Sequence, residues 1–245
     1  MNDLSSKESI AVRAIIFDAV GTLIHPDPPA PAVYAQIGKR FGSRYHEHVI
    51  KPRFVQAFEH EEDLDRRQGW RTSEEREIER WRRIVAYLLE DVADQGSCFQ
   101  VLFDHFSRPE AWRCDPGTGL LLQQLTERGL LLGLASNYDS RLRAVAAGKP
   151  ELAAIHHLFI SSEIGWRKPA PEFFAAVRKS VELPAEQILY VGDDPVNDYE
   201  GAIQASMRAV LFDPNGRYPN HSPNPIRSIQ RLNDLLPLLM SGERE

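Results

Sequence analysis

The sequence predicts an α/β fold in which helices cover both faces of a parallel sheet. Five short runs rich in β-branched and other apolar residues are predicted to be buried strands. Helical patterns separate the later runs, and such alternation is typical of parallel sheets. A long segment without strand patterns interrupts the alternation near the N-terminus. Together these observations indicate a Rossmann-like, doubly wound core with an inserted all-helical domain.

The five predicted strands are short, as expected for the strands of a compact sheet. They are Val12 to Phe17, Leu130 to Ala135, His157 to Ile160, Ile188 to Val191 and Ala209 to Phe212. In open sheets of this kind, ligands bind at the carboxyl ends of the strands. We therefore expect the chemistry of the protein at those ends.

Helices are predicted between the strands from the residues at the helix ends. Leu120 to Arg128 ends at a glycine, and Pro171 to Ser180 opens with a proline, which suits a first helical turn. Asp198 to Ala205 follows an asparagine suited to capping. The stretch Ile226 to Leu239 places four leucines on one helical face, so it is expected to pack on the sheet as a helix.

Residues 26–114 are predicted to be an insertion, because they are helical in pattern and rich in charge. Proline-dense joints bracket them, HPDPPAP from His25 to Pro31 and RPEAWRCDPG from Arg108 to Gly117. The predicted division is a core of residues 10–25 and 115–245 around a helical domain of residues 26–114.

Within the insertion, the run Glu59 to Arg83 mixes acidic and basic residues evenly. Such mixing predicts a solvated helix face. Trp70 and Trp81 lie inside this run and are expected to be packing residues.

The composition restricts the partners of the protein. Its net charge of -6 argues against nucleic acid, and no apolar run approaches the roughly 18 residues of a membrane helix. The N-terminus lacks a signal pattern, residues 1–9 are expected to be a loose tail, and neither Cys98 nor Cys114 lies in a CxxC motif. We expect a cytoplasmic protein that acts on a small molecule without binding membranes; the sequence predicts no oligomeric state.

Polar residues follow four of the predicted strands. The set comprises Asp18 in DAVGTL, Ser136 in ASN, Lys168 in WRKPAPEFF, and Asp193, Asp194 and Asp198 in VGDDPVND. One acid or serine at a strand end often only satisfies turn amides. Four such positions together indicate a site.

This set resembles the four motifs of the haloacid dehalogenase superfamily over about residues 11–240. The run from Glu163 to Phe174 and the VGDD loop carry the resemblance most specifically. The pattern is most similar to the subgroup of haloacid-dehalogenase-like hydrolase domain-containing protein three, also called rhythmically expressed gene two-like. The resemblance implies a hydrolase core with residues 26–114 as its helical cap.

Each motif residue suits one task in phosphoryl transfer. Asp18 can attack a phosphoryl group and form a covalent aspartyl intermediate. The Ser136 hydroxyl, the Lys168 ammonium and the backbone amides after Asp18 can donate to the phosphoryl oxygens. Substrate contacts are accordingly expected from Ser136, Asn137, Lys168, Gly21 and Thr22.

The crowded carboxylates predict a cation. Asp193, Asp194 and Asp198 facing Asp18 would raise one another's pKa unless a positive charge lay between them. A hard, oxygen-ligated Mg²⁺ suits such a group. The resemblance implies that Asp18, the backbone carbonyl of Val20 and Asp193 ligate it, with Asp198 nearby.

Val20 departs from the phosphatase pattern. The resemblance implies that phosphatases carry an acid here, which protonates the leaving group and later activates water. Valine can do neither, although its carbonyl can still ligate a metal. The loss corresponds to about 10²- to 10⁴-fold in rate, and it affects alkyl phosphates more than aryl or acyl phosphates.

Three interpretations remain open from the sequence. The first is a Mg²⁺-dependent phosphatase, impaired, specialised for good leaving groups, or served by a proton donor from the cap such as a histidine. The second is a carbon–halogen hydrolase, whose halide cradle could be Arg40, Arg44 or Arg53, whereas a phosphonate hydrolase would need Lys39 or Lys51. The third is a catalytically weakened protein that binds a phosphorylated ligand.

Overall fold

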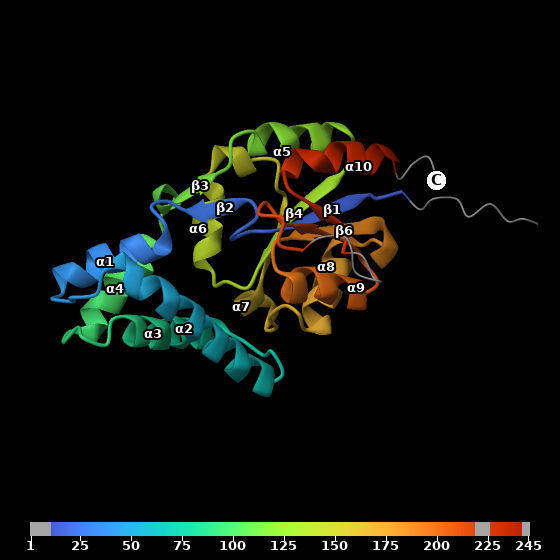
Figure 1. The fold of residues 1–245 in the computed structure, drawn as a ribbon. Helices are drawn as coiled ribbons and strands as arrows, with labels where there is room; N and C mark the ends of the chain where they lie inside the picture. Colours follow the sequence, from blue (N-terminus) through green and yellow to red (C-terminus); the bar gives the residue numbers. More distant parts are fainter. Residues whose placement is uncertain (1–10, 219–225, 242–245) are drawn as a thin grey trace, which may run out of the picture.

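A six-stranded parallel sheet forms the centre of the computed structural model, which describes residues 11–218 and 226–241 (Figure 1). Its strand order is β5-β4-β1-β6-β7-β8. In that order the strands are His157–Ile160, Leu131–Ser136, Ala14–Asp18, Ile188–Gly192, Arg208–Phe212 and Ser228–Ile229. The five predicted strands all lie in this sheet, so the predicted fold class is confirmed.

Helices cover both faces of the sheet because side chains of β1 alternate between two apolar cores. Ile15 and Phe17 pack into one core with residues of α5 (Thr118–Glu127), α6 (Arg141–Ala147) and α10 (Leu235–Ser241). Ala14 and Ile16 enter the other core with α8 (Pro171–Val181) and α9 (Gly201–Gln204), while the short α7 spans Ser161–Ile164. Figure 1 shows α5 and α10 opposite α8 and α9.

Four helices form a bundle to one side of the sheet (Figure 1). They are α1 (Ala30–Arg40), α2 (Glu47–Arg67), α3 (Glu74–Leu88) and α4 (Gln95–His105). The Ser73 and Asp94 side chains cap α3 and α4 by accepting backbone N–H groups. The chain leaves the core through β2 (Ile24–Pro26) and returns through β3 (Trp112–Cys114), which pair antiparallel.

Two sequence predictions differ from the structure near the C-terminus. Ile226 to Leu239 is not one helix, because its first residues extend the sheet as β8 and only Leu235–Ser241 forms α10. The predicted helix from Asp198 begins earlier, as a π-helix over Pro195–Glu200 that continues into α9. The predicted N-terminal tail lies outside the described residues. No described helix is long and apolar enough to cross a membrane.

The prediction of a solvated face for Glu59 to Arg83 is wrong for four charged residues, since Glu61, Asp65, Glu77 and Arg80 are buried. Each of these charges is paired with an opposite charge, which offsets the free-energy cost of removing it from water. Asp65 accepts from Arg76 at 2.8 Å and forms ion pairs with Arg80 at 3.4 Å and Arg167 at 3.2 Å.

Arg167 belongs to the core and joins the helical insertion to it. Its guanidinium donates to Glu77 of α3, and its backbone N–H donates to the carbonyl of Trp70 at 2.9 Å. A second backbone hydrogen bond runs from Thr72 to Gly165 at 3.1 Å. The tip of the α2–α3 hairpin is thus fixed beside Lys168.

Candidate active site

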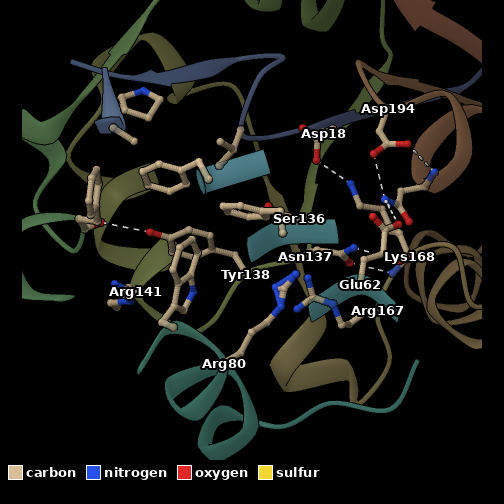
Figure 2. A pocket seen from close by; sticks show the side chains of 18 of the residues that line it. Asp18, Glu62, Arg80, Ser136, Asn137, Tyr138, Arg141, Arg167, Lys168 and Asp194 are labelled. Carbon is tan, nitrogen blue, oxygen red and sulfur yellow. Dashed lines mark hydrogen bonds and ion pairs between the residues drawn. The ribbon is translucent and has the colours of Figure 1, made fainter. Parts of the chain in front are cut away.

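The predicted site residues converge at the carboxyl ends of the parallel strands. Asp18 ends β1, Ser136 ends β4, and Asp193 follows β6, as the topology requires. Lys168 reaches the same place from the loop between α7 and α8. One cavity of about 470 Å³ is lined by these side chains together with Val20, Asn137 and Asp198 (Figure 2).

Lys168 links two carboxylates. Its Nζ donates to Asp18 Oδ1 and to Asp198 Oδ1, both at 2.6 Å, and all three side chains are buried. Burial opposes the charge of Lys168, but the two carboxylates raise its pKa well above the usual range. Burial also raises the pKa of Asp18, and the Lys168 charge only partly offsets this. The ammonium therefore stays charged and holds the predicted nucleophile in place.

Three carboxylates form a group that fits a divalent cation. Oxygens of Asp18, Asp193 and Asp198 lie within 4.8 Å of one another, and Asp18 Oδ2 is buried with no hydrogen-bond partner among the described residues. Burial and the charge of Asp198 raise the pKa of Asp193 to about 6. An oxygen-only donor set with excess negative charge suits Mg²⁺.

The turn after Asp18 fits closely against Asp193. Gly21 has φ +99°, and a Cβ at this position would lie 2.5 Å from Asp193 Oδ2. Both the backbone conformation and the contact therefore require glycine. The buried Thr22 hydroxyl donates to Asp193 Oδ1 at 3.3 Å. Gly21 and Thr22 thus lie against the carboxylate group, while their predicted substrate contacts stay predictions.

Two polar residues of the motifs hold backbone in place. The Asn137 amide donates to the Lys168 carbonyl at 2.9 Å and accepts from the Lys168 N–H at 2.7 Å. Asp194 Oδ1 accepts from the N–H groups of Val196 and Asn197, both at 2.8 Å, and caps the following helix. Asn137 therefore positions the Lys168 loop, and Asp194 lies apart from the three-carboxylate group.

Val20 lines the cavity beside Asp18 without offering an acid. No histidine of the described residues lines this cavity. The insertion contributes two lining carboxylates, Asp65 and Glu62. Asp65 is paired with arginines, and Glu62 accepts from the Asn197 amide at 3.3 Å.

The sequence did not reveal how aromatic the rest of the cavity is. Ten lining side chains are aromatic, and most of them come from the four-helix insertion. Trp70 and Trp81, expected only to pack, are among them. The three arginines considered as a halide cradle, Arg40, Arg44 and Arg53, are not among the lining residues. The lining arginines are Arg80, Arg141 and Arg167, which the sequence did not single out. An aromatic cluster in sequence-distant helices leaves no short motif, because each helix contributes only one or two rings.

Relatives of the chain include proteins named only by their domain and one protein named as a phosphatase. The human haloacid dehalogenase-like hydrolase domain-containing protein 3 is 24% identical over 215 residues, covering 82% of each chain. The glyceraldehyde 3-phosphate phosphatase of Methanopyrus kandleri is 35% identical over 106 residues, covering 42% of this chain and 44% of that protein.

Solved structures share the fold over most of the chain. The HAD hydrolase YfnB from Bacillus subtilis, described as bound to magnesium, superposes with a TM-score of 0.72 at 19% identity and covers 94% of this chain and 99% of that one. The L-2-haloacid dehalogenase of Xanthobacter autotrophicus gives 0.71 at 18% identity, with 94% and 98% covered.

The family model described as haloacid dehalogenase-like hydrolase matches residues 12–206. That segment runs from the first predicted strand, through the helical insertion, to the helix after the acidic loop. The chain belongs to the haloacid dehalogenase-like hydrolases.

Proposed function

We propose that the protein is a Mg²⁺-dependent phosphatase that acts on a small phosphate ester through an aspartyl phosphate at Asp18. The observation that carries the proposal is the buried Asp18 carboxylate held by Lys168 within a group of three carboxylates. A site built only for an anionic carboxylate substrate would gain nothing from this excess of negative charge. The Methanopyrus kandleri relative named as a phosphatase supports the same choice.

In the proposed first step, Asp18 attacks the phosphorus atom, and the bond from phosphorus to the leaving oxygen breaks with its electron pair on that oxygen. The Ser136 hydroxyl and the Lys168 ammonium donate to the phosphoryl oxygens. In the second step, water attacks phosphorus and releases inorganic phosphate and free Asp18. Asp18, Asp193, Asp198 and the Val20 carbonyl would hold the metal ion, which when bound neutralises the negative charge of the phosphoryl group.

Val20 sets the range of substrates in this proposal. Without an acid at this position, the leaving oxygen departs unprotonated, and water attacks without a general base from the loop. The missing help corresponds to roughly 3–5 kcal/mol of barrier. Esters whose leaving group is already stable as an anion are affected least.

The four-helix insertion would act as the cap of this site. Residues of α2, α3 and α4 line the cavity above Asp18, and the Arg167 contacts fix the α2–α3 hairpin against the core. The β2–β3 pair is the connection about which such a cap would move. A closed cap would exclude bulk water while the phosphoryl group is transferred to Asp18.

A carbon–halogen hydrolase is the second candidate, because Val20 suits a leaving halide that needs no proton. The three carboxylates count against it, and the arginines Arg40, Arg44 and Arg53 do not line the cavity. Release of chloride from 2-chloropropionate would be measured with and without a chelator. Chloride release that depends on Asp18 and not on Mg²⁺ would replace the phosphatase assignment.

The direct test uses acetyl phosphate, a small substrate with a good leaving group. We expect hydrolysis by the wild type with Mg²⁺, and loss of it in Asp18→Asn or with chelator. Absence of turnover together with phosphate binding would favour the catalytically weakened binding protein instead.

A further inference from the structure

Seven aromatic side chains of the cavity form a closed circuit of ring contacts, here called the aromatic wall. Successive centroids lie 4.7–6.5 Å apart. In order the members are Tyr34, Phe54, Phe58, Trp81, Tyr138, Trp112 and Phe106. Every member lines the cavity that contains Asp18 and Lys168.

Most contacts in the wall are edge-to-face. Tyr34 meets Phe54 at 75°, Phe58 meets Trp81 at 78°, and Trp81 meets Tyr138 at 61°. Aromatic pairs prefer such geometry, which offers further ring edges and faces to a flat guest. Figure 2 shows Tyr138 and the neighbouring rings on the opposite side of Ser136 from Asp18 and Lys168.

Several polar groups around the wall are already bound to the protein. The Trp112 indole N–H and the Tyr138 hydroxyl both donate to the Phe106 carbonyl, at 3.1 and 3.3 Å. Arg141 binds Asp139 with two nitrogens at 2.7 Å, and its guanidinium lies 3.5 Å from the Phe103 ring centroid. These particular groups are therefore already engaged and do not offer hydrogen bonds to the hydroxyls of a guest, and each hydroxyl left unpaired is costly.

We propose that the substrate is an aryl phosphomonoester whose ring occupies the aromatic wall while its phosphoryl group meets Asp18. The inference rests on the proposed function and on two separate observations, the apolar side chain at Val20 and the aromatic wall. The bond from Asp18 to phosphorus forms as the bond from phosphorus to the aryl oxygen breaks. The electron pair leaves with a phenolate, which takes its proton from water after release, and a second water yields inorganic phosphate.

Four substrates separate ring recognition from leaving-group chemistry. 1-Naphthyl phosphate has both the ring and a stable leaving anion, acetyl phosphate has only the latter, 2-phenylethyl phosphate has only a ring, and glycerol phosphate has neither. We expect the highest kcat/KM for 1-naphthyl phosphate. In Trp81→Leu and Phe58→Leu, that value should fall roughly 2- to 12-fold, the equivalent of one aromatic pair. The kcat/KM for acetyl phosphate, which has no ring to contact the wall, should fall by a smaller factor in the same variants.

Phe41→Leu is the matched control, because Phe41 belongs to the insertion but is not among the lining residues described. Calorimetric binding of 2-naphthol to Asp18→Asn gives a readout independent of turnover, and Trp81→Leu should weaken it.

The outcomes separate the two proposals. Asp18-dependent hydrolysis of acetyl phosphate, with 1-naphthyl phosphate no better than glycerol phosphate, would overturn the substrate assignment and leave the phosphatase standing. Binding of 2-naphthol without hydrolysis of any phosphate ester would overturn the proposed function and the substrate assignment with it.

Discussion

Replacing Lys168 by methionine should destabilise the protein in a way that depends on pH and Mg²⁺. The ammonium donates to Asp18 and Asp198 at 2.6 Å, and the three side chains are 3%, 8% and 2% exposed. Methionine keeps much of the apolar stem and removes the charge. Two carboxylates then remain buried with no cation between them.

The size of the effect follows from this burial. Removing one partner of a buried ion pair costs about 3–5 kcal/mol. Protonation limits the loss, because Asp18 already has a raised pKa and takes up a proton readily once Lys168 is gone. Each pH unit changes the free energy of one bound proton by about 1.4 kcal/mol. The loss at pH 7.5 should therefore shrink as the pH falls towards 5.5, by up to about 1.4 kcal/mol for each pH unit over which the variant binds one proton more than the wild type.

Urea unfolding, followed by circular dichroism, measures the free energy of unfolding of wild type and Lys168→Met at both pH values. Mg²⁺ should restore part of the loss at pH 7.5, because the ion replaces the missing charge. Lys179→Met, at an exposed position on α8, should change stability by less than about 0.5 kcal/mol. A Lys168→Met protein as stable as wild type, or a loss independent of pH and Mg²⁺, would refute the reasoning.

Three further predictions follow from the site and its supports. Val20→Asp should raise kcat on alkyl phosphates by about 10²- to 10⁴-fold and on aryl phosphates by much less. Equal gains on both substrates, or no gain on either, would show that the lack of an acid at position 20 does not limit the rate. Mg²⁺ affinity, measured by calorimetry, should fall as the pH drops below about 6. Protons then compete with the ion for Asp193, whose pKa is raised to about 6. A constant affinity from pH 5 to 8 would exclude Asp193 as a ligand of the metal. Glu77→Gln should cost up to about 3–5 kcal/mol at pH 7, against at most about 1 for Glu79→Gln, whose pair with Arg82 is exposed. Arg167 and Arg80 overcome the effect of burial and lower the pKa of Glu77, so the difference in stability should shrink progressively as the pH falls below about 4 towards that lowered pKa. A difference that stays constant as the pH falls through this range would exclude an electrostatic origin.

The sequence predicted the sheet well because buried parallel strands leave apolar runs that need no partner to be recognised. The same topology brings strand ends together, so Asp18, Ser136, Lys168 and Asp193 could be grouped before any contact was known. The strands β2, β3 and β8 were missed because each is two or three residues long. Strands this short are determined by the neighbouring strand to which they hydrogen-bond more than by a pattern in their own sequence.

The surroundings of the site could not be predicted, for a different physical reason. Asp65 and Glu77 have the composition of a solvated helix face. Their burial depends on partners that include Arg167, which lies in a distant part of the chain, besides Arg76 and Arg80 of the insertion itself. The aromatic wall likewise combines rings from α1, α2 and α3 with Tyr138 of the core. Neither the buried ion pairs nor the aromatic wall produces a periodic pattern within a single segment of the sequence.

The most direct test of the phosphatase assignment is the mass of the peptide containing Asp18 after acid quenching of a reaction with acetyl phosphate and Mg²⁺. Because Val20 gives no base for the attacking water, breakdown of the intermediate should be slow, and one phosphoryl group should accumulate on Asp18. Val20→Asp should reduce this accumulation, and chelator or Asp18→Asn should abolish it. Turnover without a phosphorylated Asp18, or an ester of Asp18 formed from 2-chloropropionate in its place, would contradict the assignment.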